Sequence, residues 1–149
     1  ATEPARQKLL AEHFGTQWDW VSREQLAQQV TTRRYSEALY ERNIRSISAI
    51  NRGRGIATIW VGQLVNREKL QGDGRYGWLP LVRDRDVWPL LERFNAILER
   101  TAKASGDTYV AVPPDAFTGA DFVDQGHFSA QGSRRFAGYL APAVREACR

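Results

Sequence analysis

Hydrophobic residues recur at helical spacing in two long segments of the chain. In residues 34–51 they lie three and four positions apart, at Leu39, Tyr40, Ile44, Ile47 and Ile50. After Asp86 the same period continues without a slip through Val87, Leu90, Leu91, Phe94, Ile97, Leu98 and Thr101. Such a period gives a helix one apolar face. We therefore predict two amphipathic helices, the first ended by the glycines of NRGRG and the second capped by Asp86 and ended by Gly106.

Two short apolar runs predict buried strands. IATIWVGQL, residues 56–64, is almost unbroken and rich in β-branched residues, and TYVAV, residues 108–112, is followed by Pro113 and Pro114. Such runs suit strands that are covered on both faces. The order strand, helix, strand at this spacing predicts a right-handed crossover with the two strands parallel.

Two further helices are predicted toward the ends of the chain. WDWVSREQLAQQV, residues 18–30, has Ser22 at the N-cap and Gln25 three positions later, as in a capping box. A last helix begins near Ser129. It directs these apolar residues inward: Phe136, Tyr139, Leu140 and Val144. We expect Pro142 to break or kink this helix, because proline clashes with the preceding turn.

The number of strands limits the fold. No other segment predicts a strand, yet a pair of buried parallel strands needs helices on both faces and neighbouring strands at its edges. The sequence therefore predicts half of a doubly wound α/β domain. We treat residues 1–149 as one partial domain, with a helical and loop lead-in over residues 1–33 and a βαβ core with a C-terminal helix over residues 34–149.

Composition narrows the class of protein without identifying it. The 149 residues are 42% hydrophobic and 26% charged, as in an ordinary globular domain. No apolar run approaches the roughly 18 residues that span a bilayer, and the first residues lack the apolar stretch of a signal peptide. The chain contains no Met, which suggests a processed, cleaved or engineered N-terminus, and its single Cys148 cannot form an internal disulfide.

Basic residues outnumber acidic ones by 21 to 17, for a formal charge of +4. The densest basic stretch is RNIRSISAINRGRG, within and after the first predicted long helix. No nucleic-acid recognition motif accompanies it. We interpret the stretch as a solvated helix face followed by a turn, and we predict no nucleic-acid partner.

The segment VDQGHFSAQG, ahead of the last helix, carries the groups best suited to chemistry. Asp124 and His127 are three residues apart, so in a turn the carboxylate can accept a hydrogen bond from the imidazole. A carboxylate in that place orients the ring and stabilises the imidazolium that forms when the other nitrogen takes a proton. Ser129 would cap the helix behind the turn. The spacing alone also fits a turn that merely caps a helix, with His127 at the surface.

The stretch DFVDQGHFSAQGSRRFAGYLAPAV resembles the last conserved block of the SGNH, or GDSL-type, serine hydrolases, which follows the pattern F-x-D-x-x-H-[FL]-[ST]-x-x-G. Upstream segments occur in the family's order, so the resemblance covers about residues 35–145. It implies a flavodoxin-like three-layer α/β/α sandwich, here its C-terminal half with few parallel strands. It also implies that Asp124 and His127 are the acid and general base of an esterase, acetylesterase or lipase-like enzyme that needs no cofactor. Family members of this kind are often exported, which favours a secreted or periplasmic location.

The chain departs from the family at its other catalytic blocks. The G-D-S serine, the oxyanion glycine and the G-x-N-D asparagine have no counterpart, and Gly72-Asp73-Gly74 has glycine where the serine is needed. None of the chain's serines carries the motif: Ser22, Ser36, Ser46, Ser48, Ser105, Ser129 and Ser133. We therefore expect little or no esterase activity from the chain alone, with the serine supplied by a missing N-terminal half of the hydrolase. The alternative is a non-catalytic domain that binds a carbohydrate or a protein.

Other candidate residues carry weaker signals. His13 and His127 are too far apart in the sequence to give metal-ligand spacing, so no metal site is predicted. Gln63 and Asn66, at and just after the end of the first predicted strand, could form hydrogen bonds with a substrate. Five aromatic residues could line a groove for a sugar or an acyl group, or could simply pack at its rim: Trp18, Trp20, Tyr76, Trp78 and Trp88.

Overall fold

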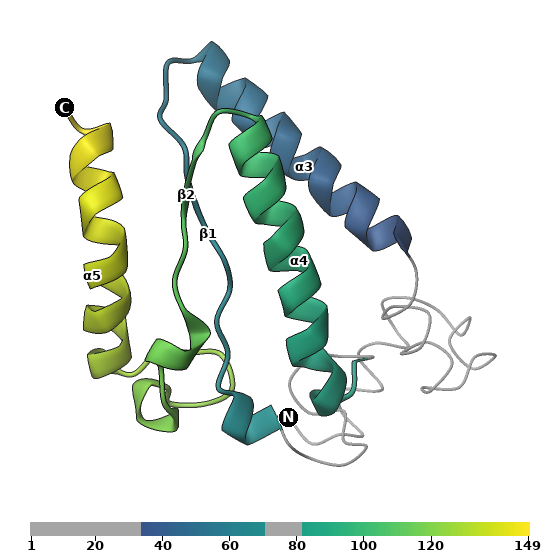
Figure 1. Ribbon diagram of the computed structural model, residues 1–149, viewed down its shortest axis with the longest axis vertical. Coiled ribbons are helices and arrows are strands. Elements are labelled where there is room, and N and C mark those ends of the chain that lie inside the picture. The colour runs from purple at the N-terminus through teal and green to yellow at the C-terminus, as the bar shows by residue number, and fades with distance from the viewer. Residues whose placement is uncertain (1–33, 71–81) are drawn as a thin grey trace, which may run out of the picture.

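The computed structural model describes residues 34–70 and 82–149. In this part of the chain, helices lie on both sides of a pair of strands (Figure 1). The described helices are α3 (Arg34–Gly53), α4 (Asp84–Ala104) and α5 (Ala130–Ala147), and the strands are β1 (Ile59–Val61) and β2 (Thr108–Val110). Short 3₁₀ turns lie at Arg67–Leu70, Pro114–Ala116 and Gly119–Asp121. The helix predicted for residues 18–30, with its Ser22 cap, lies outside the described residues.

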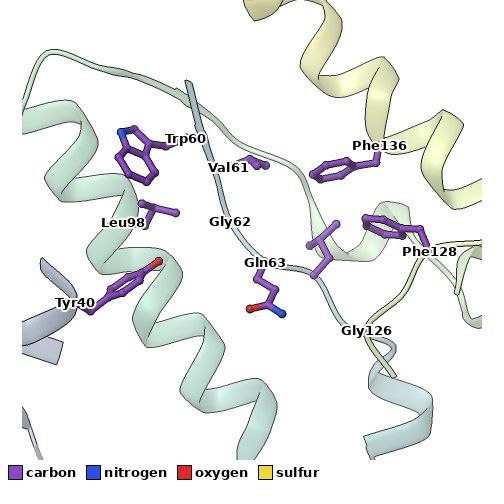
Figure 2. Close-up of a pocket in the computed structure, with 10 residues that line it drawn as sticks. Tyr40, Trp60, Val61, Gly62, Gln63, Leu98, Gly126, Phe128 and Phe136 are labelled. Carbon is purple, nitrogen blue, oxygen red and sulfur yellow. The ribbon is translucent and has the colours of Figure 1, made fainter. Parts of the chain in front are cut away.

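The two strands are parallel, with Trp60 of β1 opposite Tyr109 of β2, and α4 connects them. The predicted strand–helix–strand unit with a parallel pair is therefore confirmed. Trp60 and Tyr109 both pack toward α3 and α4, whereas Val61 lies on the face toward Phe136 of α5 (Figure 2). The described residues form a small α/β arrangement in which helices cover both faces of a two-stranded sheet.

Both strands are shorter than the apolar runs 56–64 and 108–112 that predicted them. Beyond β1, the main chain of Gln63 bonds to the Asn95 side chain of α4. Its N–H donates to Oδ1 and its carbonyl accepts from Nδ2, each at 2.9 Å. An amide side chain thus takes over the role of a neighbouring strand. β2 ends shortly before Pro113, which has no N–H to donate to a ladder.

The N-cap predicted for α4 is wrong, and its predicted end is right. The helix begins at Asp84, after Arg83 in extended conformation, and the Asp86 N–H donates to the Arg83 carbonyl at 2.8 Å. Asp86 therefore lies inside the first turn, where a negative charge suits the helix dipole. At the other end Gly106 adopts a φ of 74°, the left-handed conformation expected of a residue that follows a helix.

Helix α5 begins at its predicted cap but does not end at Pro142. It continues to Ala147. The carbonyl that loses its helical partner belongs to Gly138, four residues earlier. Because Gly138 is exposed, that carbonyl can bond to water instead.

Three apolar residues predicted to face the core are exposed. Ile47 and Ile50 of α3 are 45% and 56% exposed, and Val144 of α5 is 47% exposed. In the described part of the chain the sheet has only two strands, which is too narrow to cover these positions.

Candidate active site

Asp124 and His127 form a hydrogen-bonded pair in the loop between the last 3₁₀ turn and α5. The imidazole Nδ1 lies 2.8 Å from Asp124 Oδ2 and 3.0 Å from Oδ1. The same carboxylate accepts hydrogen bonds from the main-chain N–H groups of Gly126, at 2.9 Å, and of His127 itself, at 2.8 Å. The bond that the sequence spacing predicted is therefore present, and it is reinforced from the backbone.

The hydrogen bonds from the backbone set the charge of the pair. The N–H groups of Gly126 and then His127, followed by the His127 ring, lower the pKa of Asp124 from its ordinary value to about 2. The carboxylate is therefore ionised at neutral pH and can only accept hydrogen bonds. It follows that Nδ1 carries the hydrogen of the neutral ring, which leaves the lone pair on Nε2.

The Nε2 side of the ring is open to an incoming group. The His127 side chain is 76% exposed, against 44% for Asp124. Among the described residues no side chain bonds to Nε2. The nearby Ser129 hydroxyl is already engaged, because it donates to the Ala120 carbonyl and accepts from the Gly132 N–H. The described part of the chain thus presents a base with no nucleophile beside it.

The loop is a narrow hairpin tied to the end of β1. Phe122 and Phe128 form an antiparallel bridge, and the Val123 N–H donates to the His127 carbonyl at 2.9 Å. The Asn66 N–H, from the segment after β1, donates to the Gln125 carbonyl at 2.8 Å. Asp124 and His127 are therefore held at the carboxyl end of the sheet, where open α/β sheets bind their ligands.

Aromatic packing makes the base of this hairpin rigid. The rings of Phe122 and Phe128 stack at 5.0 Å, and Phe128 lies 5.0 Å from Phe136 of α5. Phe122 is buried in a cluster with Leu64 and Phe117. The two ends of the hairpin therefore pack against the core, whereas His127 between them is exposed.

A close contact joins the hairpin to α5. Ser129 caps the helix by accepting the Gly132 N–H at 3.2 Å. Gly132 is buried against the Asp121 main chain, and a Cβ at this position would lie 2.0 Å from the Asp121 carbonyl oxygen. Only glycine fits there. The serine and the glycine of the motif thus both position the helix that follows the histidine.

Asp121 is a buried acid that the sequence analysis missed. Its carboxylate accepts from the Thr118 N–H at 2.9 Å and lies 3.3 Å from an Arg135 nitrogen. The Thr118 N–H, with help from Arg135, lowers the pKa of Asp121. The T-x-x-D spacing of Thr118 and Asp121, typical of a capping box, could have identified this acid in the sequence. In the structure the box caps the 3₁₀ turn Gly119–Asp121.

No protein-family model, curated protein or solved structure matches this chain.

Three of the remaining sequence candidates lie among the described residues: Gln63, Asn66 and Trp88. Gln63 is held through its main chain by Asn95. Asn66 is buried, and neither nitrogen nor oxygen of its amide has a hydrogen-bond partner among the described residues. Trp88 is half-buried, with the Arg67 guanidinium over its ring at 5.1 Å, so that ring packs at a rim. Several other candidates lie outside the described residues: His13, Trp18, Trp20, Tyr76, Trp78 and Gly72-Asp73-Gly74.

Within residues 34–70 and 82–149, no group of three or more His, Cys, Asp or Glu side chains could hold a metal ion. No helix in that part of the chain has the length and apolar character needed to cross a bilayer.

Proposed function

We propose that this chain supplies the acid and the general base of an SGNH-type serine ester hydrolase. The observation that carries the proposal is the ionised Asp124 carboxylate bonded to Nδ1 of an exposed imidazole whose Nε2 has no partner in the described part of the chain. The nucleophilic serine and the oxyanion donors come from a segment of the hydrolase outside these 149 residues. The substrate is a carboxylic ester, such as an O-acetyl group on a carbohydrate or a lipid ester.

The pair would work by moving one proton back and forth. His127 Nε2 takes the proton of the serine hydroxyl as its oxygen attacks the ester carbonyl. The imidazolium, stabilised by Asp124, then gives that proton to the departing alkoxide as its bond to the acyl carbon breaks. The alkoxide leaves as an alcohol, and the acyl group remains on the serine. Water attacks the acyl-serine in the same way, with His127 again as base, and releases the carboxylic acid and the free serine. No cofactor takes part.

A fluorophosphonate probe tests this assignment, because it labels only an activated serine. We expect the assembled hydrolase to be labelled on a serine outside this chain. Replacing His127 with Ala should lower the labelling rate and the turnover of an acetyl ester by about 10⁴-fold. The matched control is His13→Ala, which changes the chain's other histidine and should leave both rates unaltered. Intact-mass analysis would show which polypeptide carries the adduct.

Two outcomes would contradict the proposal. Full turnover by the His127→Ala hydrolase would remove His127 from the mechanism. A sample that contains this chain and no labelled serine under any condition would favour the alternative, a non-catalytic domain that binds a carbohydrate or a protein.

A further inference from the structure

The tip of the hairpin that bears the Asp–His pair has little apolar packing of its own. Val123 is 63% exposed, and the His127 side chain is 76% exposed. The aromatic cluster holds the hairpin at Phe122 and Phe128, on either side of the tip. A segment with few buried apolar contacts opens easily unless other contacts hold it. The position of residues 123–127 therefore depends on hydrogen bonds rather than on burial.

The segment that follows β1 supplies two hydrogen bonds to this tip. The Lys69 Nζ donates to the Val123 carbonyl at 3.0 Å. The Asn66 N–H donates to the Gln125 carbonyl at 2.8 Å. One of the two donors is a side chain and the other belongs to the main chain. Lys69 is therefore the contact that a substitution can remove without changing the path of the backbone.

The two carbonyls belong to the peptide units just before and just after Asp124 and its own carbonyl. Because a peptide unit is planar, a bond that fixes its carbonyl also fixes its N–H. The unit of the Gln125 carbonyl contains the Gly126 N–H, which donates to Asp124 Oδ1 at 2.9 Å. The unit of the Val123 carbonyl ends at the Asp124 nitrogen, so its orientation sets that of the Asp124 main chain. The segment after β1 thus holds the acid of the pair from both sides.

The 3₁₀ turn that presents Lys69 is anchored in the core. Leu70 is buried in a cluster with Val87 and Leu90 of α4. The Lys69 N–H donates to the Asn66 carbonyl at 3.2 Å, which closes the turn. The main chain at Lys69 is therefore fixed, and only the side chain loses conformational freedom when the ammonium bonds to the hairpin.

The other charged residues of this turn bind the chain farther from the pair. Glu68 accepts a hydrogen bond from the Gly119 N–H at 3.3 Å, and Arg67 forms an ion pair with Asp115. Both side chains of that ion pair are exposed, and exposed pairs contribute little to stability. These contacts hold the segment that leads to the hairpin, whereas Lys69 holds the hairpin itself.

We propose that Lys69 is a positioning residue for the Asp124–His127 pair. The inference rests on the proposed function for its effect on catalysis, and on the geometry of this chain for its effect on the imidazole. The ammonium is a charge-assisted donor to a carbonyl. Without it the peptide unit ahead of Asp124 is free to turn, and the carboxylate holds Nδ1 for less of the time. A ring released from the carboxylate can carry its hydrogen on Nε2, and in that form Nε2 accepts no proton from a serine.

Nitrogen-15 NMR of the imidazole rings tests the positioning role in the full 149-residue chain, which has two histidines. At a pH where the rings are neutral, we expect His127 to carry its hydrogen on Nδ1. Lys69→Met should shift both His127 ring nitrogens toward the average of the two tautomers and leave the His13 ring unchanged. Lys69→Arg keeps a cationic donor and should preserve the wild-type resonances. The matched control is Lys103→Met, because Lys103 pairs with Glu99 on α4; it should leave the His127 resonances where they are.

Turnover of an acetyl ester by the assembled hydrolase tests the effect on catalysis. Lys69→Met should lower kcat by about tenfold with little change in KM, because a misplaced catalytic group lowers the rate more than the binding of substrate. Lys69→Arg should restore most of the loss. Unchanged His127 resonances in Lys69→Met, or an unchanged kcat where turnover depends on His127, would overturn the positioning role. Shifted resonances together with turnover that does not depend on His127 would support the positioning role and remove the proposed function.

Discussion

Three groups converge on the Asp124 carboxylate: the Gly126 N–H, the His127 N–H and the His127 ring. Two of the three come from the backbone, so the position of the carboxylate depends on the turn rather than on the imidazole. The ring is then placed by a carboxylate that is already fixed. At the scale of single residues, the turn therefore fixes the position of the Asp124 carboxylate and, through it, that of the His127 ring.

The ionisation of Asp124 can be measured directly. Its pKa of about 2 in the folded chain is below the roughly 3.9 of an unfolded aspartate. Its contribution to stability is therefore complete above about pH 4 and is lost as the pH falls toward 2. In an NMR titration of the carboxyl carbon, we expect Asp124 to remain mostly ionised at about pH 3. The difference in unfolding free energy between the wild type and Asp124→Asn should narrow below pH 4. An NMR titration midpoint near pH 4 would contradict a carboxylate that accepts these three hydrogen bonds.

At this scale the sequence was informative about the residues of the motif and silent about their partners. The D-x-x-H spacing predicted the bond between Asp124 and His127, and it is present. Gly126 was not singled out, although its N–H is the largest influence on the Asp124 pKa. A main-chain donor has no side chain to identify it, so only the conformation of the turn reveals its role.

Among the elements, α5 carries the most exacting contact of the site. Its first turn lies directly on the Asp121 main chain, at Gly132. Ser129 holds the same turn by its cap, and Phe136, one turn later, packs on Phe128 of the hairpin. The position of the helix therefore determines the position of the loop that bears His127.

Two glycine-to-alanine substitutions in α5 distinguish the effect of this close contact on stability from the effect of helix propensity. Gly132→Ala would bring a Cβ to 2.0 Å from the Asp121 carbonyl oxygen. We expect it to lower the unfolding free energy by about 2 kcal/mol or more and to shift the His127 amide resonance. Gly138→Ala, on the same helix, meets nothing within 4 Å and should raise stability by about 0.5–1 kcal/mol. Urea denaturation gives both values. Equal changes in unfolding free energy for Gly132→Ala and Gly138→Ala would mean that the close contact does not exist in solution.

The sequence predicted the helices better than the ends of the strands. A long apolar period identified α3 and α4, which pack together through Ile44 of α3 and Ile97 and Leu98 of α4. The strand runs were too long because periodicity cannot show that Asn95 replaces the ladder at Gln63. Asp86 was taken for a cap because it is a capping residue type, whereas the helix begins two residues earlier. Tertiary contacts decide these boundaries, and local pattern does not contain them.

At the scale of the whole molecule, the described layers are wider than the sheet between them. The apolar periods of α3 and α5 correctly indicated faces to be covered, but Ile47, Ile50 and Val144 have no strand beneath them. The sequence, which predicted two strands, indicated the same shortage of strands. Sequence and structure therefore agree that the two-stranded sheet does not cover its helices, and they differ only in which apolar residues are left exposed.

Hydrogen exchange would show whether the edge of β1 is free in the chain by itself. The ladder directs the Trp60 N–H to β2 and the Val61 N–H away from it. In the isolated monomer we expect the Trp60 amide to exchange at least tenfold more slowly than the Val61 amide. Exchange is measured by NMR at a concentration where the chain is monomeric by light scattering. Equal protection of both amides in the monomer would mean that the chain already covers this edge itself. In that case the exposed isoleucines of α3 would need another explanation.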